Sequence, residues 1–226
     1  MKLKNILLLI IILSASVYSQ YNMEEALMKG GWSGGLAGWV GWENLDISEN
    51  LDSTSANSIV DGFNFIFSSR NGSIVETNGV FGFDFQWREK SSTTKPDPNP
   101  SNTSEYIRDR VWFIGLWARY FIPLGGNFAM YFEGSGGYAV FSQKNEIISD
   151  LEFVKDNSEA FANGFAYNAG FGFSHFVTTN VAFEITGRWE GGSLNGESEN
   201  YIGNISDLNV KLGNIFILFG FQIYLR

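Results

Sequence analysis

The sequence predicts an all-β chain that folds as a single antiparallel, up-and-down β-barrel of eight strands spanning a membrane. Apolar residues recur at every second position along most of the chain, which is the period of a strand with two different faces. Aromatic residues make up 16% of the chain and glycines number 26, so some surfaces are very apolar while others carry little side chain. The connections between predicted strands alternate between short and long, as they do in transmembrane barrels.

The first 19 residues have the order of a secretory signal peptide. Lys2 and Lys4 form a basic start, residues 6–13 are an unbroken apolar run, and small residues lead to Ser19. A helix needs about 20 apolar residues to cross a bilayer, so this run predicts cleavage after Ser19 rather than a membrane anchor. Residues 20–226 are then expected to form one exported domain.

Composition excludes several classes of function. Removal of residues 1–19 takes the formal net charge from −9 to −11, because only Lys2 and Lys4 are lost, and this argues against binding to nucleic acid. The chain has no cysteine and one histidine, which excludes a disulfide framework and a thiolate metal site. No cofactor is predicted.

The strands are read from the two-residue period. In residues 80–88 phenylalanine and tryptophan alternate with glycine, amide and charged residues, and residues 181–189 and 214–225 alternate in the same manner. Each predicted segment is longer than the 9–11 residues, approximately, that a tilted strand needs to cross a bilayer. The eight segments are 31–44, 57–69, 73–90, 107–122, 126–142, 160–176, 180–192 and 208–226.

The links between these segments predict how the barrel is oriented. Three short links lie at 70–72, 123–125 and 177–179, and four long links lie at 45–56, 91–106, 143–159 and 193–207. Both termini then lie on the short-turn side, so the short turns are expected to be periplasmic and the long loops extracellular. Asn71-Gly72 is the signal of a tight hairpin turn.

Two further local features lead to structural predictions. Asp61 shares its parity with Phe63 and Phe65, which predicts a bulge or an early strand end near Asp61. The alternating prolines of 95–100 predict an extended excursion within the 91–106 loop.

The size of the side chains on the apolar parity distinguishes a membrane barrel from a soluble, lipocalin-like one. Phenylalanine and tryptophan are too bulky for the bore of eight strands, so this parity is expected to face lipid, while the parity rich in Gly, Ser, Asn and single charges fills the interior. Tryptophans at similar heights predict an aromatic girdle at the membrane interface. The predicted girdle comprises Trp42, Trp87, Trp112 and Trp189 at one level, with Trp32, Tyr120 and Phe176 near the opposite end.

Charged residues also occur on the inward parity, in equal numbers of acids and bases. Charges inside a barrel must be paired or hydrogen-bonded, so an ion-pair network that plugs the lumen is predicted. The alternatives are a gated polar path and a catalytic carboxylate. The residues are Asp84, Arg88, Arg119, Glu133, Glu184 and Arg188.

Enzymatic chemistry has one candidate group. Ser174, His175 and nearby Asn180 are similar to the serine–histidine arrangement of lipid A deacylases, but neighbours on a strand point to opposite faces. His175 is therefore interpreted as an interfacial residue near the short turns, and the protein is not expected to be an enzyme.

The long loops carry carboxylates. Oxygen ligands suit Ca²⁺ or Mg²⁺ shared with lipopolysaccharide phosphates, but a solvated acidic surface is the favoured interpretation and no spacing matches an ordered calcium loop. No metal site is therefore predicted. The clusters are Asp46, Glu49 and Asp52; Asp150, Glu152 and Asp156; and Glu197, Glu199 and Asp207.

Three sequence features carry a resemblance to a known family: Gln20 after Val17-Tyr18-Ser19, the glycine-rich segment 31–35, and the turn at 176–183. With these features the chain resembles the small outer-membrane β-barrel family typified by OmpA and OmpX, in the manner of porin-like members common in Bacteroidetes. The resemblance covers nearly the whole mature chain. It implies barrel topology, a place in the bacterial outer membrane, and contact with outer-membrane lipid, lipopolysaccharide and the barrel assembly machinery. The ending 224–226 departs from the terminal aromatic residue of many such barrels.

The expected function is that of a non-enzymatic outer-membrane barrel that acts through acidic extracellular loops in adhesion, recognition or envelope integrity. A narrow channel, or a carrier of small or hydrophobic molecules, is the first alternative. A lipid A-modifying enzyme is the second. The sequence does not name an extracellular partner.

Overall fold

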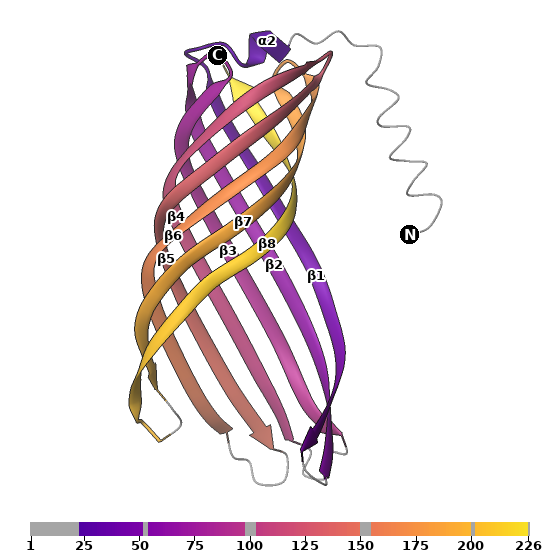
Figure 1. Cartoon of the computed structure of the whole chain (residues 1–226), viewed down its shortest axis with the longest axis vertical. Helices are drawn as coiled ribbons and strands as arrows, with labels where there is room; N and C mark the ends of the chain where they lie inside the picture. The colour runs from indigo at the N-terminus through magenta and orange to yellow at the C-terminus, as the bar shows by residue number, and fades with distance from the viewer. Residues whose placement is uncertain (1–22, 52–53, 98–102, 150–154, 200–201, 226) are drawn as a thin grey trace, which may run out of the picture.

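The computed structural model describes residues 23–51, 54–97, 103–149, 155–199 and 202–225, with side chains described for 25–40, 62–94, 104–148, 158–199 and 202–225. These residues form a closed barrel of antiparallel strands in the order β1-β2-β3-β4-β5-β6-β7-β8, preceded by a one-turn helix, α2 (Met23–Ala26) (Figure 1). The strands are β1 (Trp32–Leu51), β2 (Thr54–Glu76), β3 (Gly79–Asp97), β4 (Thr103–Gly125), β5 (Phe128–Ser149), β6 (Lys155–Thr178), β7 (Val181–Glu199) and β8 (Ile205–Leu225).

The predicted fold class is confirmed, but the strands are longer than predicted. Most residues of the four predicted long links belong to strands that continue pairing, for example from Val111↔Phe141 to Thr103↔Ser149 between β4 and β5. The reason is that backbone pairing satisfies N–H and C=O groups whether or not the side chains alternate in polarity. The predicted extracellular loops are therefore mainly a strand extension of the barrel, and residues 52–53, 98–102, 150–154 and 200–201 at their tips lie outside the described residues.

The first short turn lies six residues beyond the predicted one. Asn71-Gly72 was expected to turn, but both residues pair within β2, and the chain reverses at Thr77-Asn78, where Asn78 has φ 68°. Asparagine tolerates this left-handed conformation because its short polar side chain can hydrogen-bond locally. Gly72 lies instead where β2 and β3 approach closely, since a Cβ there would come 2.5 Å from the Phe81 carbonyl oxygen.

The bulge expected at Asp61 is also absent from the described backbone. Asp61 pairs in continuous register with Asn44 on β1 and with Thr93 on β3. The register shifts that do occur lie next to the short turns, at 74–76, 123–125 and 176–178. The irregular alternation of polar and apolar residues near Asp61 is therefore not accompanied by a shift in backbone register.

The barrel wall is complete near the termini and open toward the other end. Strands β1 and β8 pair only from Trp32↔Leu225 to Gly38↔Phe219 among the described residues, whereas β1 pairs with β2 as far as Leu51↔Thr54. In Figure 1 the free parts of β1 and β8 diverge beyond this short seam. Trp39 lies at its end and contacts the Phe219 ring at a centroid distance of 6.3 Å. Both strands therefore have unpaired backbone edges beyond Gly38 and Phe219.

The residues before β1 close the barrel at the end near the termini. Leu27 is fully buried in an apolar cluster with Ile74, Phe121 and Tyr224, and its carbonyl accepts a hydrogen bond from the Asn78 amide at 3.1 Å. The sequence did not suggest this contact. Across the described residues, no helix has the length and hydrophobicity needed to traverse a membrane.

Candidate functional site

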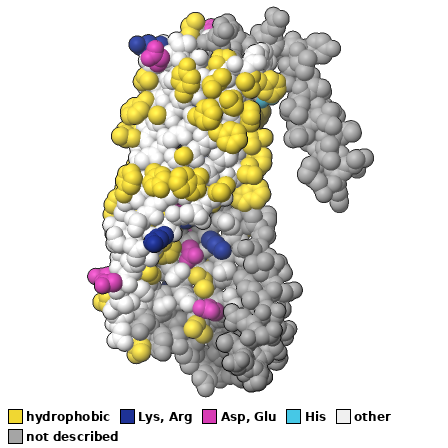
Figure 2. Space-filling view, in the orientation of Figure 1, with side chains coloured by type: hydrophobic (Ala, Val, Ile, Leu, Met, Phe, Trp, Pro, Cys, Tyr) yellow, Lys and Arg dark blue, Asp and Glu magenta, His cyan; other side chains and the backbone are white. Residues whose placement is uncertain are grey.

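The outer surface carries a wide apolar band. Figure 2 shows hydrophobic side chains gathered over the half of the barrel nearer α2, with few charged side chains among them. On β4 the band extends from Trp112 to Tyr120, and on β8 from Ile215 to Leu225. These lengths match the approximately 9–11 residues with which a tilted strand crosses a bilayer. The apolar parity thus faces outward, as predicted. The rival arrangement, a soluble lipocalin-like barrel with its apolar residues inside, is excluded.

The predicted girdle residues lie at the two limits of this band. Trp112 and Trp189 are exposed, and Trp87 stacks on Trp112 at 5.4 Å between ring centroids. Trp32 and Tyr120 are exposed at the end near the termini. The side chain of Trp42 lies outside the described residues.

Phe176 does not belong to the girdle, and its predicted place there is wrong. Its ring is fully buried inside the barrel against Tyr224, at 5.3 Å between centroids. The residue on the outer face is His175, which stacks on Phe128 at 4.4 Å. Phe176 shares the inward parity of the buried Ser174, and pairing is continuous as far as Phe176↔Ala182, so the two-residue period itself places its ring in the lumen.

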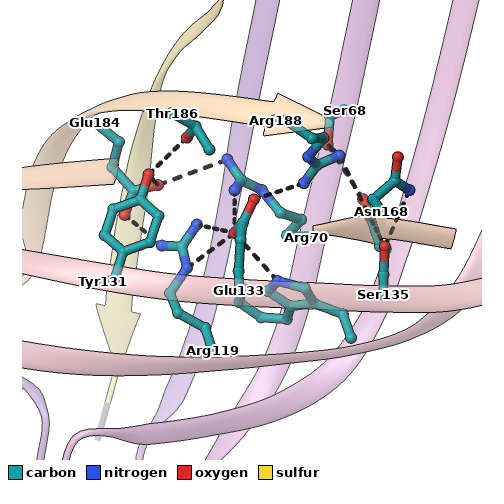
Figure 3. A network of polar contacts seen from close by, with 12 residues as sticks. Ser68, Arg70, Arg119, Tyr131, Glu133, Ser135, Asn168, Glu184, Thr186 and Arg188 are labelled. Carbon is teal, nitrogen blue, oxygen red and sulfur yellow. Dashed lines mark hydrogen bonds and ion pairs between the residues drawn. The ribbon is translucent and has the colours of Figure 1, made fainter. Parts of the chain in front are cut away.

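A layer of buried ion pairs crosses the lumen, with Glu133 of β5 at its centre (Figure 3). The Glu133 carboxylate accepts from Arg70 at 2.6 Å, from Arg119 at 2.8 Å and from Arg188 at 2.9 Å. The Trp117 indole donates to the same carboxylate at 3.3 Å. One carboxylate therefore joins β2, β4 and β7, which contribute the three arginines.

Two further carboxylates complete the charge balance. Glu184 accepts from Arg119 at 2.5 Å and from the Ser174 hydroxyl at 3.0 Å. Asp84 lies 3.2 Å from Arg188 and accepts from Ser135 at 2.9 Å. The layer thus holds three acids and three bases with no net charge, and this neutrality is what a buried ionic network requires.

The ion-pair layer lies between two apolar parts of the lumen. Leu27, Phe121 and Phe176 pack on the side of the termini, and Phe113, Leu194 and Leu212 pack on the other side. Beside Glu133 and Arg188 the residual cavity has no room for a water molecule. At the level of the ion-pair layer, the described side chains therefore fill the lumen.

All six predicted lumen residues point inward, but they do not form one set. Arg88 pairs instead with Glu190 at 2.6 Å, on the side of the layer away from the termini. Its expected place in the central network is taken by Arg70, which sequence reasoning missed because the tight turn was assigned to Arg70-Asn71-Gly72. The inward parity of Ile66, Ser68, Arg70 and Ile74 is the signal that could have found it.

The serine–histidine candidate does not assemble. The Ser174 hydroxyl is buried and bonded to Glu184, whereas His175 stacks on Phe128 at the outer face. The two side chains therefore lie on opposite faces, as predicted. Among the described residues, no group of three His, Cys, Asp or Glu side chains could hold a metal ion.

Of the predicted acidic clusters, the structure describes the side chains of Glu197, Glu199 and Asp207 only. Asp46, Glu49, Asp52, Asp150, Glu152 and Asp156 have no described side chains.

A hollow of about 450 Å³ lies on the strand extension, with Glu197 and Glu199 on one wall and Arg108, Arg110 and Lys144 on the other. A hydrogen bond to the Tyr106 hydroxyl raises the pKa of Arg108.

The fold and the exterior define a class: a closed eight-stranded barrel with an apolar outer band and an ion-paired lumen. No protein-family model matches the chain, and no curated protein matches its sequence. Among solved structures it is similar to the outer membrane protein OprG from Pseudomonas aeruginosa, with a TM-score of 0.47 and 14% identity over 88% of this chain and 97% of that one.

Two other solved structures give similar values. A major outer membrane protein from Thermus thermophilus has a TM-score of 0.47 and 10% identity, covering 87% of this chain and 100% of its own. The outer membrane protease OmpT from Escherichia coli has a TM-score of 0.45 and 16% identity, covering 85% of this chain and 76% of its own.

Proposed function

We propose that the protein is a non-enzymatic bacterial outer-membrane barrel with a sealed lumen, which acts through the strand extension at its loop end in adhesion, recognition or envelope integrity. The ion-pair layer around Glu133 carries this proposal, because it spans the bore and leaves no room for water beside Arg188. The apolar band from Trp112 to Tyr120 supports insertion in a bilayer. Export by residues 1–19 would deliver the chain to that membrane.

The sealed lumen is tested by single-channel recording of the refolded mature chain in a planar lipid bilayer. We expect no steady openings, because the arginines that cross the bore are all held by carboxylates. Folding is verified first by a difference in gel migration between unboiled and boiled samples. Steady conductance from verified barrels would overturn the proposal, as would recovery of the mature chain from the soluble periplasm without detergent.

A second candidate function is a carrier of small hydrophobic molecules, and the short seam between β1 and β8 favours it. Beyond Gly38 and Phe219 the wall has two unpaired edges at the height of Ile215, an exposed residue at the limit of the apolar band. Because β1 and β8 do not pair there, this gap would connect the lipid-facing surface to the interior. Inside, Leu212 and Phe113 line that part of the lumen. An apolar molecule could therefore enter from the side without crossing the ion-pair layer.

A disulfide across the seam tests this second function. If the register of Gly38↔Phe219 continued, Val40 would face Ile217, and the chain has no other cysteine to interfere. We expect oxidation of the Val40→Cys/Ile217→Cys variant to reduce uptake of a fluorescent fatty acid by proteoliposomes to the level of protein-free vesicles, and reduction to restore it. The Val40→Cys single variant is the control. Equal uptake in oxidised and reduced samples, with the crosslink verified by mass, would contradict the carrier function.

A further inference from the structure

The hollow on the strand extension has an ordered distribution of charge. Its charged lining residues come from two neighbouring cross-strand rows over β4–β7, on the parity that continues the outer face. One row is Arg110↔Ser142, Ser142↔Phe161 and Phe161↔Glu197; the other is Arg108↔Lys144, Lys144↔Glu159 and Glu159↔Glu199. The walls on β4 and β5 are thus basic, and those on β6 and β7 are acidic.

Like charges face one another within each wall. Arg108 lies opposite Lys144, and Glu159 lies opposite Glu199. Like charges directly opposite on neighbouring strands destabilise a sheet. Among the described residues, Glu159, Glu197 and Glu199 have no ion-pair partner in the protein. On the basic wall Arg110 and Arg108 lie 2.9 Å and 3.6 Å from Glu89, and Lys144 lies 3.0 Å from Glu146. Two carboxylates thus serve three cations there. A ligand with an anionic and a cationic group would supply the remaining counter-charge on both walls.

The height of each wall indicates the order of the two ligand groups. On β4, Arg110 lies two residues beyond Trp112, at the limit of the apolar band. On β7, Glu197 lies eight residues beyond the exposed Trp189. Because strands of a barrel are tilted, a cross-strand row climbs from the band at β4 to a greater height at β7. The basic wall is therefore nearer the bilayer than the acidic wall.

We infer that this hollow binds the phosphoethanolamine head group of a lipid in the surrounding membrane, with its phosphate on Arg108, Arg110 and Lys144 and its ammonium on Glu159, Glu197 and Glu199. Guanidinium groups suit phosphate oxygens. The acidic wall suits an ammonium rather than a divalent cation, because no described trio of carboxylates is arranged to hold a metal ion. The exposed Phe161 at 52% offers an apolar contact between the walls. The inference rests on the proposed membrane location.

Native mass spectrometry of the full mature chain, released from nanodiscs with equal phosphatidylethanolamine and phosphatidylglycerol of matched acyl chains, tests the inference. We expect the wild type to retain phosphatidylethanolamine about fivefold more than phosphatidylglycerol, which is the difference that one exposed charge pair would give. Arg108→Gln/Lys144→Gln should lose retention of both lipids. Glu159→Gln/Glu199→Gln should still retain lipid but lose the preference.

The control variant Lys211→Gln/Glu76→Gln removes one exposed base and one exposed acid that do not line the hollow, and it should behave as the wild type. Equal retention of the two lipids by the wild type, or an unchanged ratio in both hollow variants, would overturn the inference. Because heat-dependent gel migration reports the barrel separately, this failure is distinguishable from failure of the proposed function.

A competition experiment then identifies the source of the head group. Displacement of the phospholipid by lipid A that bears phosphoethanolamine, but not by unmodified lipid A, assigns the head group to the glycolipid. Retention of the phospholipid against both assigns it to the phospholipid.

Discussion

Glu133→Gln is expected to lower the free energy of unfolding by about 3–5 kcal/mol, the cost of breaking a buried ion pair by removing one partner. The amide keeps the volume of the side chain but removes the charge that Arg70, Arg119 and Arg188 share at 2.6–2.9 Å. The layer would then hold one uncompensated positive charge between two apolar clusters, where water has no room to screen it. Equilibrium unfolding in lipid vesicles with guanidinium, followed by tryptophan fluorescence, measures the change.

The matched control for this variant is Glu76→Gln, which neutralises an exposed carboxylate beside a short turn and should change stability by no more than about 0.5 kcal/mol. A paired variant, Arg70→Met/Glu133→Gln, restores neutrality and should recover a large part of the loss, because an apolar replacement of a whole buried pair is often neutral. A loss below about 1 kcal/mol in the single variant would mean that the network does not hold the barrel together.

Phe171→Arg is expected to destabilise the inserted barrel by about 2–4 kcal/mol, the range for arginine on the lipid face near the bilayer midplane. Phe171 of β6 is 49% exposed and lies between Tyr167 at one limit of the apolar band and His175 at the other. The cost arises because hydrocarbon cannot solvate a guanidinium group. The same unfolding measurement in vesicles of defined lipid gives the change.

Asn195→Arg is the comparison for the lipid-face variant. Asn195 is exposed on β7, on the same outward parity as Trp189 but beyond it, where water is expected to solvate a charge. The Asn195→Arg variant should therefore leave the free energy of unfolding unchanged within about 0.5 kcal/mol. If the two arginine variants destabilised the protein equally, the apolar band would not be a lipid-facing surface.

Sequence patterns alone separated the two faces of most strands. Along β4 the exposed Trp112, Ile114 and Leu116 alternate with buried Phe113 and Trp117, and such alternation is a local property because successive side chains point to opposite faces of a strand. The eight strands, their antiparallel order and the inward position of Glu133 and Glu184 follow from the same period. Phe176 was wrongly expected in the girdle, although it shares the inward parity of Ser174 and pairs in continuous register with Ala182.

What the sequence determined about this protein is thus which side chains meet lipid and which meet the lumen. The tertiary structure decided which of them meet one another. Arg70 and Glu133 are 63 residues apart, and their contact depends on the stagger of β2 against β5, which no local pattern records. The open edges beyond Gly38 and Phe219 have the same origin. Pairing of the first strand with the last depends on the positions of all the strands between them, which no local pattern records.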